Sequence, residues 1–241
     1  MCTVSWTRTA TATELFFNRD ERRQRQPARP PQRREHRGTV LLTPEDGDFG
    51  VTWIAANEHG VTLALLNRYQ DAAHEGPGPF TSRGLLVLDL AAATHDRASL
   101  EEGLAATDVE RFRAFTLLCL EPDGTAHRAL WNGRLLTPPE PCHPPLASSG
   151  HDPHGIDVRR SDLYHQLVGA GGTPDHLFDF HRSHLPERGP LSPCMHRPDA
   201  STVSLTHVVV EDRWVTMAYA AGPPCRHALG SPISLARHER A

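Results

Sequence analysis

The residue with the clearest chemical potential is Cys2, in the opening stretch MCTVSW. An initiator methionine can be removed when the next residue is small, and removal here leaves a thiol and a free α-amino group on one residue. The pKa of an α-amino group is about 7.7–8.0 and that of a thiol about 8.5, so the amine can act as base for the thiol. The pattern predicts an N-terminal nucleophile; the alternative is a cysteine without function beside the first strand.

Such a nucleophile needs a carboxylate for its ammonium, groups that favour the thiolate, and donors for the oxyanion. Asn18 and Asp20 lie two residues apart in a predicted strand, so their side chains share a face. They flank Cys2 if that strand pairs with the first one. Arg19 is expected on the opposite face or reaching round. Asn67, at the end of another predicted strand, offers an amide donor.

Two short stretches carry a resemblance to known families. MCT and the later NRDE resemble the NRDE-motif family, also called the transport and Golgi organisation protein 2 family. The chain through Asn67 also resembles the cysteine-type N-terminal nucleophile hydrolases of the choloylglycine hydrolase and penicillin V acylase group. Those hydrolases begin Met-Cys-Thr and carry an Arg-Asn-x-Asp cluster. Asn18 and Asp20 match that cluster, Phe17 stands at the Arg position, and Arg19 takes the variable position.

The resemblance extends to the segment 57–67. Those hydrolases carry Asn-Glu-x-Gly before a strand that ends in Asn, and residues 57–60 lead to Asn67 with the same spacing. The resemblance implies that Asn67 is an oxyanion donor. It also implies a second Asn in the stretch PLASSGHDPHG, where Ser148 and Ser149 stand instead. Arg197, before the last predicted hairpin, is the candidate for a late arginine that supports the nucleophile.

The 16 histidines raise the possibility of a metal site. His151 and His154 form an H-x-x-H pair in a predicted loop, and His181 and His184 form another on a predicted helix. Neither pair resembles HExxH, and no cysteine has zinc-finger spacing. We therefore expect surface histidines, no metal site and no cofactor; a metal-binding protein is the third and weakest alternative.

The secondary structure that must position these residues follows from periodicity and turn signals. Strands are predicted at both ends of the chain and helices mainly in the middle. The predicted strands and hairpins are 2–6, 14–20, 51–56, 61–67, 115–133 and 202–220. The predicted helices are 85–93, 99–115 (with Ser99 as N-cap and Glu102 completing a capping box), 157–169 and 174–184. Segments 19–37 and 69–84 are predicted loops, and we expect residues 21–37 and 69–84 to form the mouth of the site.

These elements predict a single α+β domain over residues 1–241, with sheets covered by helices. The resemblance narrows this to the N-terminal nucleophile hydrolase fold, an αββα sandwich of two stacked, mainly antiparallel sheets with helices outside.

Bulk properties exclude other classes. The net charge of −4 and the isoelectric point near 6.5 argue against a nucleic-acid binder, and the arginine-rich stretch 19–37 is expected to be solvated. The sequence predicts neither a membrane span nor a secretory signal. Five scattered cysteines without CxxC indicate a reducing compartment, the cytoplasm.

The resemblance implies a cysteine-type amidohydrolase of a non-peptide, or linear, C–N amide bond. Cys2 would attack the carbonyl, Asn67 would stabilise the oxyanion and Asp20 would hold the amine, with Asn18 or Arg19 tuning the site. The alternative is a non-catalytic carrier or trafficking factor for a lipid or haem on the same fold, which the serines at the second Asn position favour. Either function predicts a small-molecule amide or lipid-like ligand.

Overall fold

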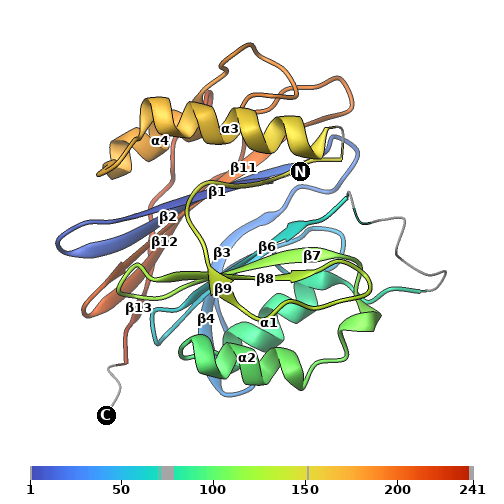
Figure 1. The fold of residues 1–241 in the computed structure, drawn as a ribbon. Helices are drawn as coiled ribbons and strands as arrows, with labels where there is room; N and C mark the ends of the chain where they lie inside the picture. The colour runs from blue at the N-terminus through green and yellow to red at the C-terminus, as the bar shows by residue number, and fades with distance from the viewer. Residues whose placement is uncertain (1, 70, 72–78, 151, 239–241) are drawn as a thin grey trace.

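The computed structural model describes all residues except 1, 70, 72–78, 151 and 239–241. The chain folds into four layers: a helix pair, two stacked antiparallel sheets, and a second helix pair (Figure 1). This arrangement confirms the predicted αββα sandwich.

The upper sheet, called sheet A here, combines strands from both ends of the chain. Its strand order is β10-β1-β2-β11-β12-β13, with every neighbouring pair antiparallel. Its strands are β1 (Cys2–Arg8), β2 (Ala12–Arg22), β10 (Leu146–Ser148), β11 (Ala200–Glu211), β12 (Trp214–Ala220) and β13 (Ile233–Ala236). The predicted hairpins at both ends of the chain are therefore confirmed.

The lower sheet, sheet B, follows the chain order from β3 to β9. Its strands are β3 (Arg29–His36), β4 (Thr39–Glu45), β5 (Ile54–Asn57), β6 (Thr62–Asn67), β7 (Phe115–Leu120), β8 (Ala126–Trp131) and β9 (Glu140–Pro141). The hairpin of β7 and β8 is the one that the sequence predicts.

Two helix pairs cover the outer faces of the sheets (Figure 1). Those against sheet B are α1 (Arg83–Ala93) and α2 (Arg97–Ala105); those against sheet A are α3 (Pro153–Leu167) and α4 (Pro174–Arg182). No helix among the described residues is both long and apolar enough to cross a membrane.

Strand β6 shows how the layers are built, because nearly every residue in it is buried. Ala64 and Leu66 belong to the core between the two sheets, while Leu63 and Leu65 belong to the core between sheet B and the helices α1 and α2. Successive side chains of β6 therefore alternate between the two faces of sheet B, although residues 63–66 are all apolar. A third core, which includes Phe180, joins sheet A to α3 and α4.

The predicted helix 99–115 and the predicted loop 19–37 differ from the structure. The helix predicted over 99–115 ends at Ala105, and β7 begins at Phe115. Asp96, rather than Ser99, is the N-cap: its side chain accepts the Ser99 N–H at 2.9 Å, and the Ser99 hydroxyl accepts the Asp96 N–H at 3.0 Å. The helix therefore begins about one turn before the predicted N-cap.

Much of the predicted loop 19–37 is also strand. β2 continues to Arg22, and residues 29–36 form β3 at the edge of sheet B. An edge strand tolerates proline because one row of its backbone groups faces away from the sheet. Arg29 and Arg33 of β3 are exposed whereas Arg19 of β2 is buried, so the predicted solvation holds for only part of the stretch. The predicted absence of secondary structure was wrong.

The side chain of Phe17 is fully buried between the sheets, at the position where the hydrolases carry Arg. We expect Phe17→Ala to lower the free energy of unfolding by about 3–5 kcal/mol, because it leaves a cavity in a close-packed core. Urea denaturation measures this. Leu135→Ala is the control, since Leu135 is 63% exposed and should change stability by at most about 0.5 kcal/mol. Equal small losses in both variants would contradict the inter-sheet placement of Phe17.

Candidate active site

Cys2 is the first residue of β1 and lies between two neighbouring strands. It pairs with Arg19 of β2 on one side and with Ser148 of β10 on the other. The backbone N–H of Cys2 donates to the Ser148 hydroxyl at 3.1 Å. The structure thus brings Ser148, which stands where the resemblance implies a second Asn, directly beside Cys2.

The register of β1 and β2 decides which side chains share the face of Cys2. Directly opposed residues of an antiparallel pair lie on the same face, so Arg19 shares the inner face of sheet A with Cys2. Asn18 and Asp20 project from the other face, toward α3 and α4. The expected faces are therefore reversed: Arg19 needs no reaching round to share the face of Cys2, and Asn18 and Asp20 do not flank Cys2 on that face.

Asn18 is fully buried beneath α4. Its side-chain amide donates to the carbonyls of His181, at 2.8 Å, and Pro193, at 2.9 Å. These bonds fix the end of α4 and the segment after it relative to β2. Asn18 is therefore part of the framework under the site rather than of the cavity beside Cys2.

Asp20 is held by neighbours on three elements. The Thr202 hydroxyl of β11 donates to Asp20 Oδ1 at 2.6 Å, and Arg160 Nη2 of α3 lies 3.7 Å from Oδ2. A β-bulge between Thr202 and Ser204 sets this pairing: without the extra residue, Val203 would oppose Asp20. The backbone N–H of Asp20 in turn forms a hydrogen bond to the Cys2 thiol.

Arg160 is the main site residue that the sequence analysis missed. Its guanidinium is fully buried and donates to the hydroxyl of Thr3 and, at 2.8 Å, to the carbonyl of Ser192. The spacing in the sequence could have indicated this residue. Arg160 follows the buried Ile156 by four residues and precedes the buried Tyr164 by four, so it lies on the apolar face of α3. An arginine at such a position indicates a buried partner.

Burial dominates the protonation of this cluster. It raises the pKa of the Cys2 thiol, and the charge of Asp20 adds to that rise, whereas the Asp20 N–H and the charge of Arg19 oppose it. Burial also raises the pKa of Asp20, which Arg160 opposes. A partly buried thiol with a raised pKa needs an adjacent base before it can act as a nucleophile.

Asn67 ends β6 and approaches Cys2 from sheet B. Asn67 and Cys2 line the same cavity of about 410 Å³, and the Asn67 amide donates to the hydroxyl of Tyr69 at 3.0 Å. The cavity thus has one wall from each sheet.

The turn before β6 explains why the 57–60 motif accompanies Asn67. The Asn57 side chain accepts the Val61 N–H at 3.0 Å and donates to the carbonyls of Ala91 and Thr94. Gly60 has a φ of 85°, a conformation that L side chains rarely adopt. The motif therefore ties the start of β6 to α1, and this fixes where the strand ends at Asn67.

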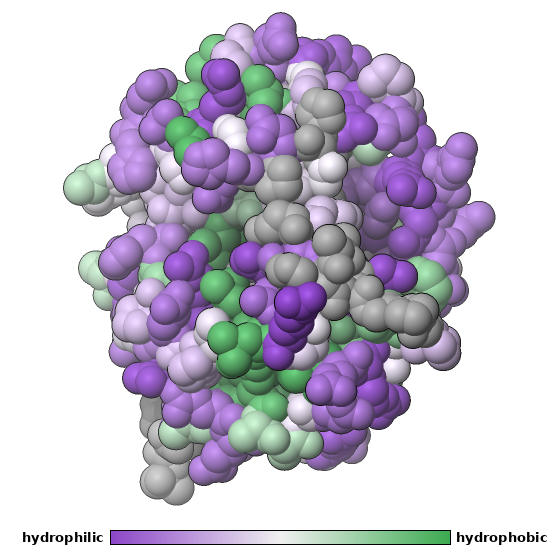
Figure 2. All heavy atoms as spheres, turned by 45° about the vertical axis from the view of Figure 1, so that its right-hand side comes forward, coloured by the Kyte–Doolittle hydropathy of each residue, from purple (hydrophilic) through white to green (hydrophobic). Residues whose placement is uncertain are grey.

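Residues of both predicted segments line this cavity; that these segments form its mouth stays a prediction. Glu21 and Arg25 come from the first, and residues 80–84 come from the second; residues 70 and 72–78 lie outside the described residues. In the view of Figure 2, apolar surface shows between polar side chains.

Cations stacked on aromatic rings line the same cavity. The Arg19 guanidinium lies 4.4 Å from the ring centroid of Trp53, and that of Arg113 lies 4.6 Å from Phe80. Arg19 also pairs with Asp46 at 2.5 Å. The cavity wall therefore combines aromatic rings with arginines, of which Arg19 is paired with a carboxylate.

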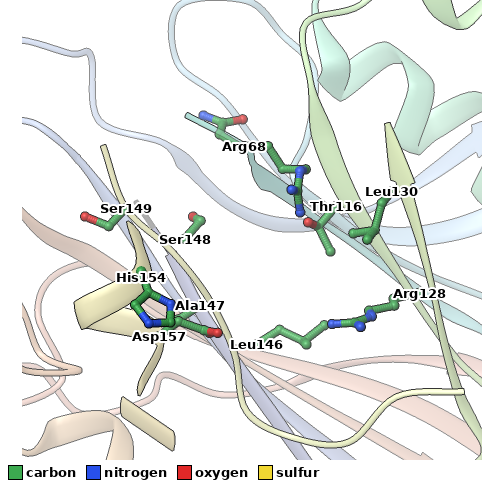
Figure 3. Close-up of a pocket in the computed structure, with 11 residues that line it drawn as sticks. Arg68, Thr116, Arg128, Leu130, Leu146, Ala147, Ser148, Ser149, His154 and Asp157 are labelled. Carbon is green, nitrogen blue, oxygen red and sulfur yellow. The ribbon is translucent and has the colours of Figure 1, made fainter. Parts of the chain in front are cut away.

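A second cavity of about 320 Å³ shares Asn67 and has Ser148 in its wall. Figure 3 shows Ser148, His154 and Asp157 on one side, from β10 and α3, and on the other Arg68, which follows β6, and Arg128 of β8. The gap between the two sheets therefore continues past Cys2 on the β10 side.

Arg197 is not brought into the cavity walls described above. Its guanidinium pairs with Asp199 at 2.8 Å, and its carbonyl accepts hydrogen bonds from Arg23. A role for Arg197 in supporting Cys2 stays a prediction.

The histidine pairs also differ from expectation. His181 is fully buried rather than at the surface: its Nε2 is 2.8 Å from the Ser5 hydroxyl, and burial lowers its pKa to about 3. His154 lies in the first turn of α3 rather than in a loop. His151 lies outside the described residues.

Comparisons with known proteins agree with this fold. The family model described as Transport and Golgi organisation 2 matches residues 1–140. No curated protein matches the sequence.

Solved structures share the fold at low sequence identity. The chain is similar to a Caenorhabditis elegans ortholog of N-acylethanolamine-hydrolyzing acid amidase, with 10% identity and a TM-score of 0.58 over 86% of this chain and 92% of the other. It is also similar to a mutant of conjugated bile acid hydrolase from Clostridium perfringens, with 11% identity and a TM-score of 0.58 over 98% of this chain and 92% of the other. A second variant of that hydrolase gives 12% identity and a TM-score of 0.56 over the same shares.

Arg160→Met removes the cation that faces Asp20 and leaves a buried carboxylate without it. We expect the free energy of unfolding to fall by about 3–5 kcal/mol at neutral pH. Arg159→Met is the matched control, because Arg159 is the exposed neighbour on the same helix, and it should cost at most about 0.5 kcal/mol. Urea unfolding of both variants measures the difference; indistinguishable midpoints would mean that the buried pair does not form.

Proposed function

The chain belongs to the Transport and Golgi organisation 2 family, and from this premise we propose that it is a cysteine-type amidohydrolase of a non-peptide, or linear, C–N amide bond. The observation that carries the proposal is that Cys2 and Asn67 come from opposite sheets to line one cavity. The names of proteins with a similar fold, an acid amidase ortholog and a conjugated bile acid hydrolase, support the reaction class.

The first step uses the α-amino group of Cys2, which removal of Met1 would free. The Cys2 nitrogen already donates to the Ser148 hydroxyl, so Ser148 would orient the amine. The amine takes the thiol proton, and the Asp20 N–H and the charge of Arg19 stabilise the thiolate. The sulfur then forms a bond to the amide carbonyl carbon.

The second step resolves the tetrahedral intermediate. The Asn67 amide donates to the oxyanion, and Asp20 stabilises the ammonium of Cys2. The C–N bond breaks as the leaving nitrogen takes a proton from that ammonium, which leaves a thioester on Cys2. Water, activated by the same amine, attacks the thioester, releases the carboxylic acid and restores the thiol.

The cavity walls favour a particular amide. Trp53 and Phe80 contribute aromatic side chains to the wall, in which four arginines outnumber three carboxylates: Arg19, Arg25, Arg83 and Arg113 against Asp20, Glu21 and Asp46. An N-acyl amide with an apolar acyl group and a negatively charged amine portion fits this combination.

The second candidate is a carrier or trafficking factor for a lipid or haem on the same fold. Two observations favour it: Ser148 stands where a second oxyanion donor is expected, and burial raises the pKa of the Cys2 thiol. A carrier needs the cavity but no thiolate, so formation of an acyl adduct separates the two functions.

Residues 1–241 are proposed to act as one domain, because β1 and β2 share a sheet with strands from the other end of the chain. Five free cysteines fit a reducing compartment such as the cytoplasm.

We expect the mature protein to begin at Cys2 and Cys2 to react fastest of the five thiols with limiting iodoacetamide. The physical reason is the adjacent amine, which Cys119 and Cys142 lack; burial raises the pKa of Cys142 to about 11 and also raises that of Cys119. Intact mass and peptide mapping measure both outcomes. A retained Met1, or a Cys2 that stays unlabelled while another thiol reacts, contradicts the nucleophile assignment.

Asn67→Ala should lower kcat roughly 10²–10³-fold, or about 2.7–4 kcal/mol of barrier, and leave substrate affinity nearly unchanged. The oxyanion exists fully only in the tetrahedral intermediate, so the loss falls on the chemical step. The assay follows hydrolysis of a panel of N-acyl amides, from short acyl amino acids to long-chain acyl amides, with mass detection of an acyl adduct on Cys2.

Tyr69→Phe is the control, because it removes the hydrogen bond between Asn67 and Tyr69 but keeps the amide. It should leave kcat within about threefold of wild type if the amide acts on the oxyanion. If an acyl adduct forms and Asn67→Ala does not change its rate of formation, Asn67 is not the oxyanion donor but only caps the strand. No adduct with any amide, together with tight lipid or haem binding, selects the carrier.

A further inference from the structure

Four metal-ligating side chains converge away from the cavity beside Cys2. They come from three segments: the turn after α4, the loop before β11, and the segment after β12. Their ligand atoms all lie within 4.8 Å of one another, and the four residues are His184, Cys194, His196 and Cys225. None of the four lines either cavity described above.

Two distances between ligand atoms fit the edges of a tetrahedral zinc site. His196 Nε2 is 3.6 Å from Cys194 Sγ and 3.4 Å from Cys225 Sγ. Zinc binds sulfur at about 2.3 Å and imidazole nitrogen at about 2.0–2.1 Å, so sulfur and nitrogen ligands of a tetrahedral site lie about 3.5–3.6 Å apart. Both contacts are therefore close to the edges of such a site.

His184 supplies an independent observation. Its Nε2 is buried and has no hydrogen-bond partner among the described residues. Its ring lies 5.1 Å from that of His196, at an angle of 67°. A buried polar atom without a partner costs free energy, and a metal ion between the rings and the thiols would remove that cost.

We propose that these four side chains bind one zinc ion as a closed site of two thiolates and two imidazoles. Soft thiolates and imidazoles together select zinc among the abundant divalent ions, whereas magnesium and calcium prefer oxygen ligands. On binding, each thiol loses its proton to solvent, so the two thiolates balance the charge of the ion. All four positions are filled by protein, which makes the site structural rather than catalytic.

The site would hold the loop between α4 and β11 in place. That loop supplies the Ser192 carbonyl that accepts from Arg160 and the Pro193 carbonyl that accepts from Asn18. Cys225, from the far end of the chain, would anchor the loop against the segment after β12. Zinc would therefore stabilise the layer that carries the Asp20–Arg160 pair, whether or not the protein is a hydrolase.

Sequence spacing did not reveal this site. Cys194 and His196 are two residues apart, but His184 and Cys225 lie far from them in the chain, unlike the paired spacings of zinc fingers. Only the fold brings the segments together.

The test measures metal in the full-length protein, purified with a reductant and dialysed against metal-free buffer. We expect about one zinc ion per chain, retained through dialysis. Replacement by Co²⁺ should give the thiolate-to-cobalt charge-transfer band and the visible bands of a tetrahedral site. Chelation should lower the melting temperature and increase labelling of Cys225 by iodoacetamide, and zinc should reverse both changes.

Variants assign the ligands. Cys194→Ser and Cys225→Ser should each lower zinc affinity at least about tenfold and weaken the charge-transfer band. Cys142→Ser and His95→Ala are the controls and should keep full zinc content: Cys142 lies outside the cluster, and His95 stacks edge-on with His59 without a thiol.

Three results would overturn the proposal. The first is reduced wild-type protein that binds neither zinc nor cobalt after reconstitution, a measurement that does not depend on any variant folding. The second is a disulfide between Cys194 and Cys225 in protein that takes up no metal once reduced. The third is full zinc content in folded Cys194→Ser and Cys225→Ser.

Discussion

Asp20 and Arg160 face each other with both side chains fully buried, and the site depends on how this pair is satisfied. A buried ion pair is tolerated only when hydrogen bonds satisfy the remaining donors and acceptors. Here Thr202 of β11 donates to the carboxylate, while Thr3 of β1 and Ser192 accept from the guanidinium. The pair therefore requires sheet A, α3 and the loop before β11 to assemble together.

The same requirement explains the organisation of the cavity. Cys2 sits at the end of sheet A, and its thiol accepts the N–H of Asp20, so the position of the sulfur follows the layer that holds the pair. Asn67 belongs to sheet B, whose position follows the core between the sheets and the turn at Asn57. The geometry between sulfur and amide is thus set by the packing of two sheets, which close-packed side chains hold rigidly.

How much of this could be predicted depended on whether the signal was local. Cys2, Asn67 and the hairpins rest on neighbours in sequence, and their placement could be predicted. The face of Arg19 was assigned incorrectly because register, not alternation alone, decides which residues share a face. β10 is three residues long and carries no periodicity, and the bulge at Thr202 changes the pairing without changing composition. Arg160 was missed because its partner lies on another element.

Ser148 bears on both candidate functions through its place in β10. Ser148 is in register with Cys2, and its hydroxyl is 3.1 Å from the Cys2 nitrogen. In a hydrolase, Asn67 would be the oxyanion donor, and Ser148 of β10 would orient the α-amino group that acts as base. In a carrier the same contact would simply close the edge of sheet A. The chemical meaning of Ser148 therefore depends on whether the nitrogen it touches is a peptide group or a free amine, and that is decided by processing at Met1 rather than by the fold.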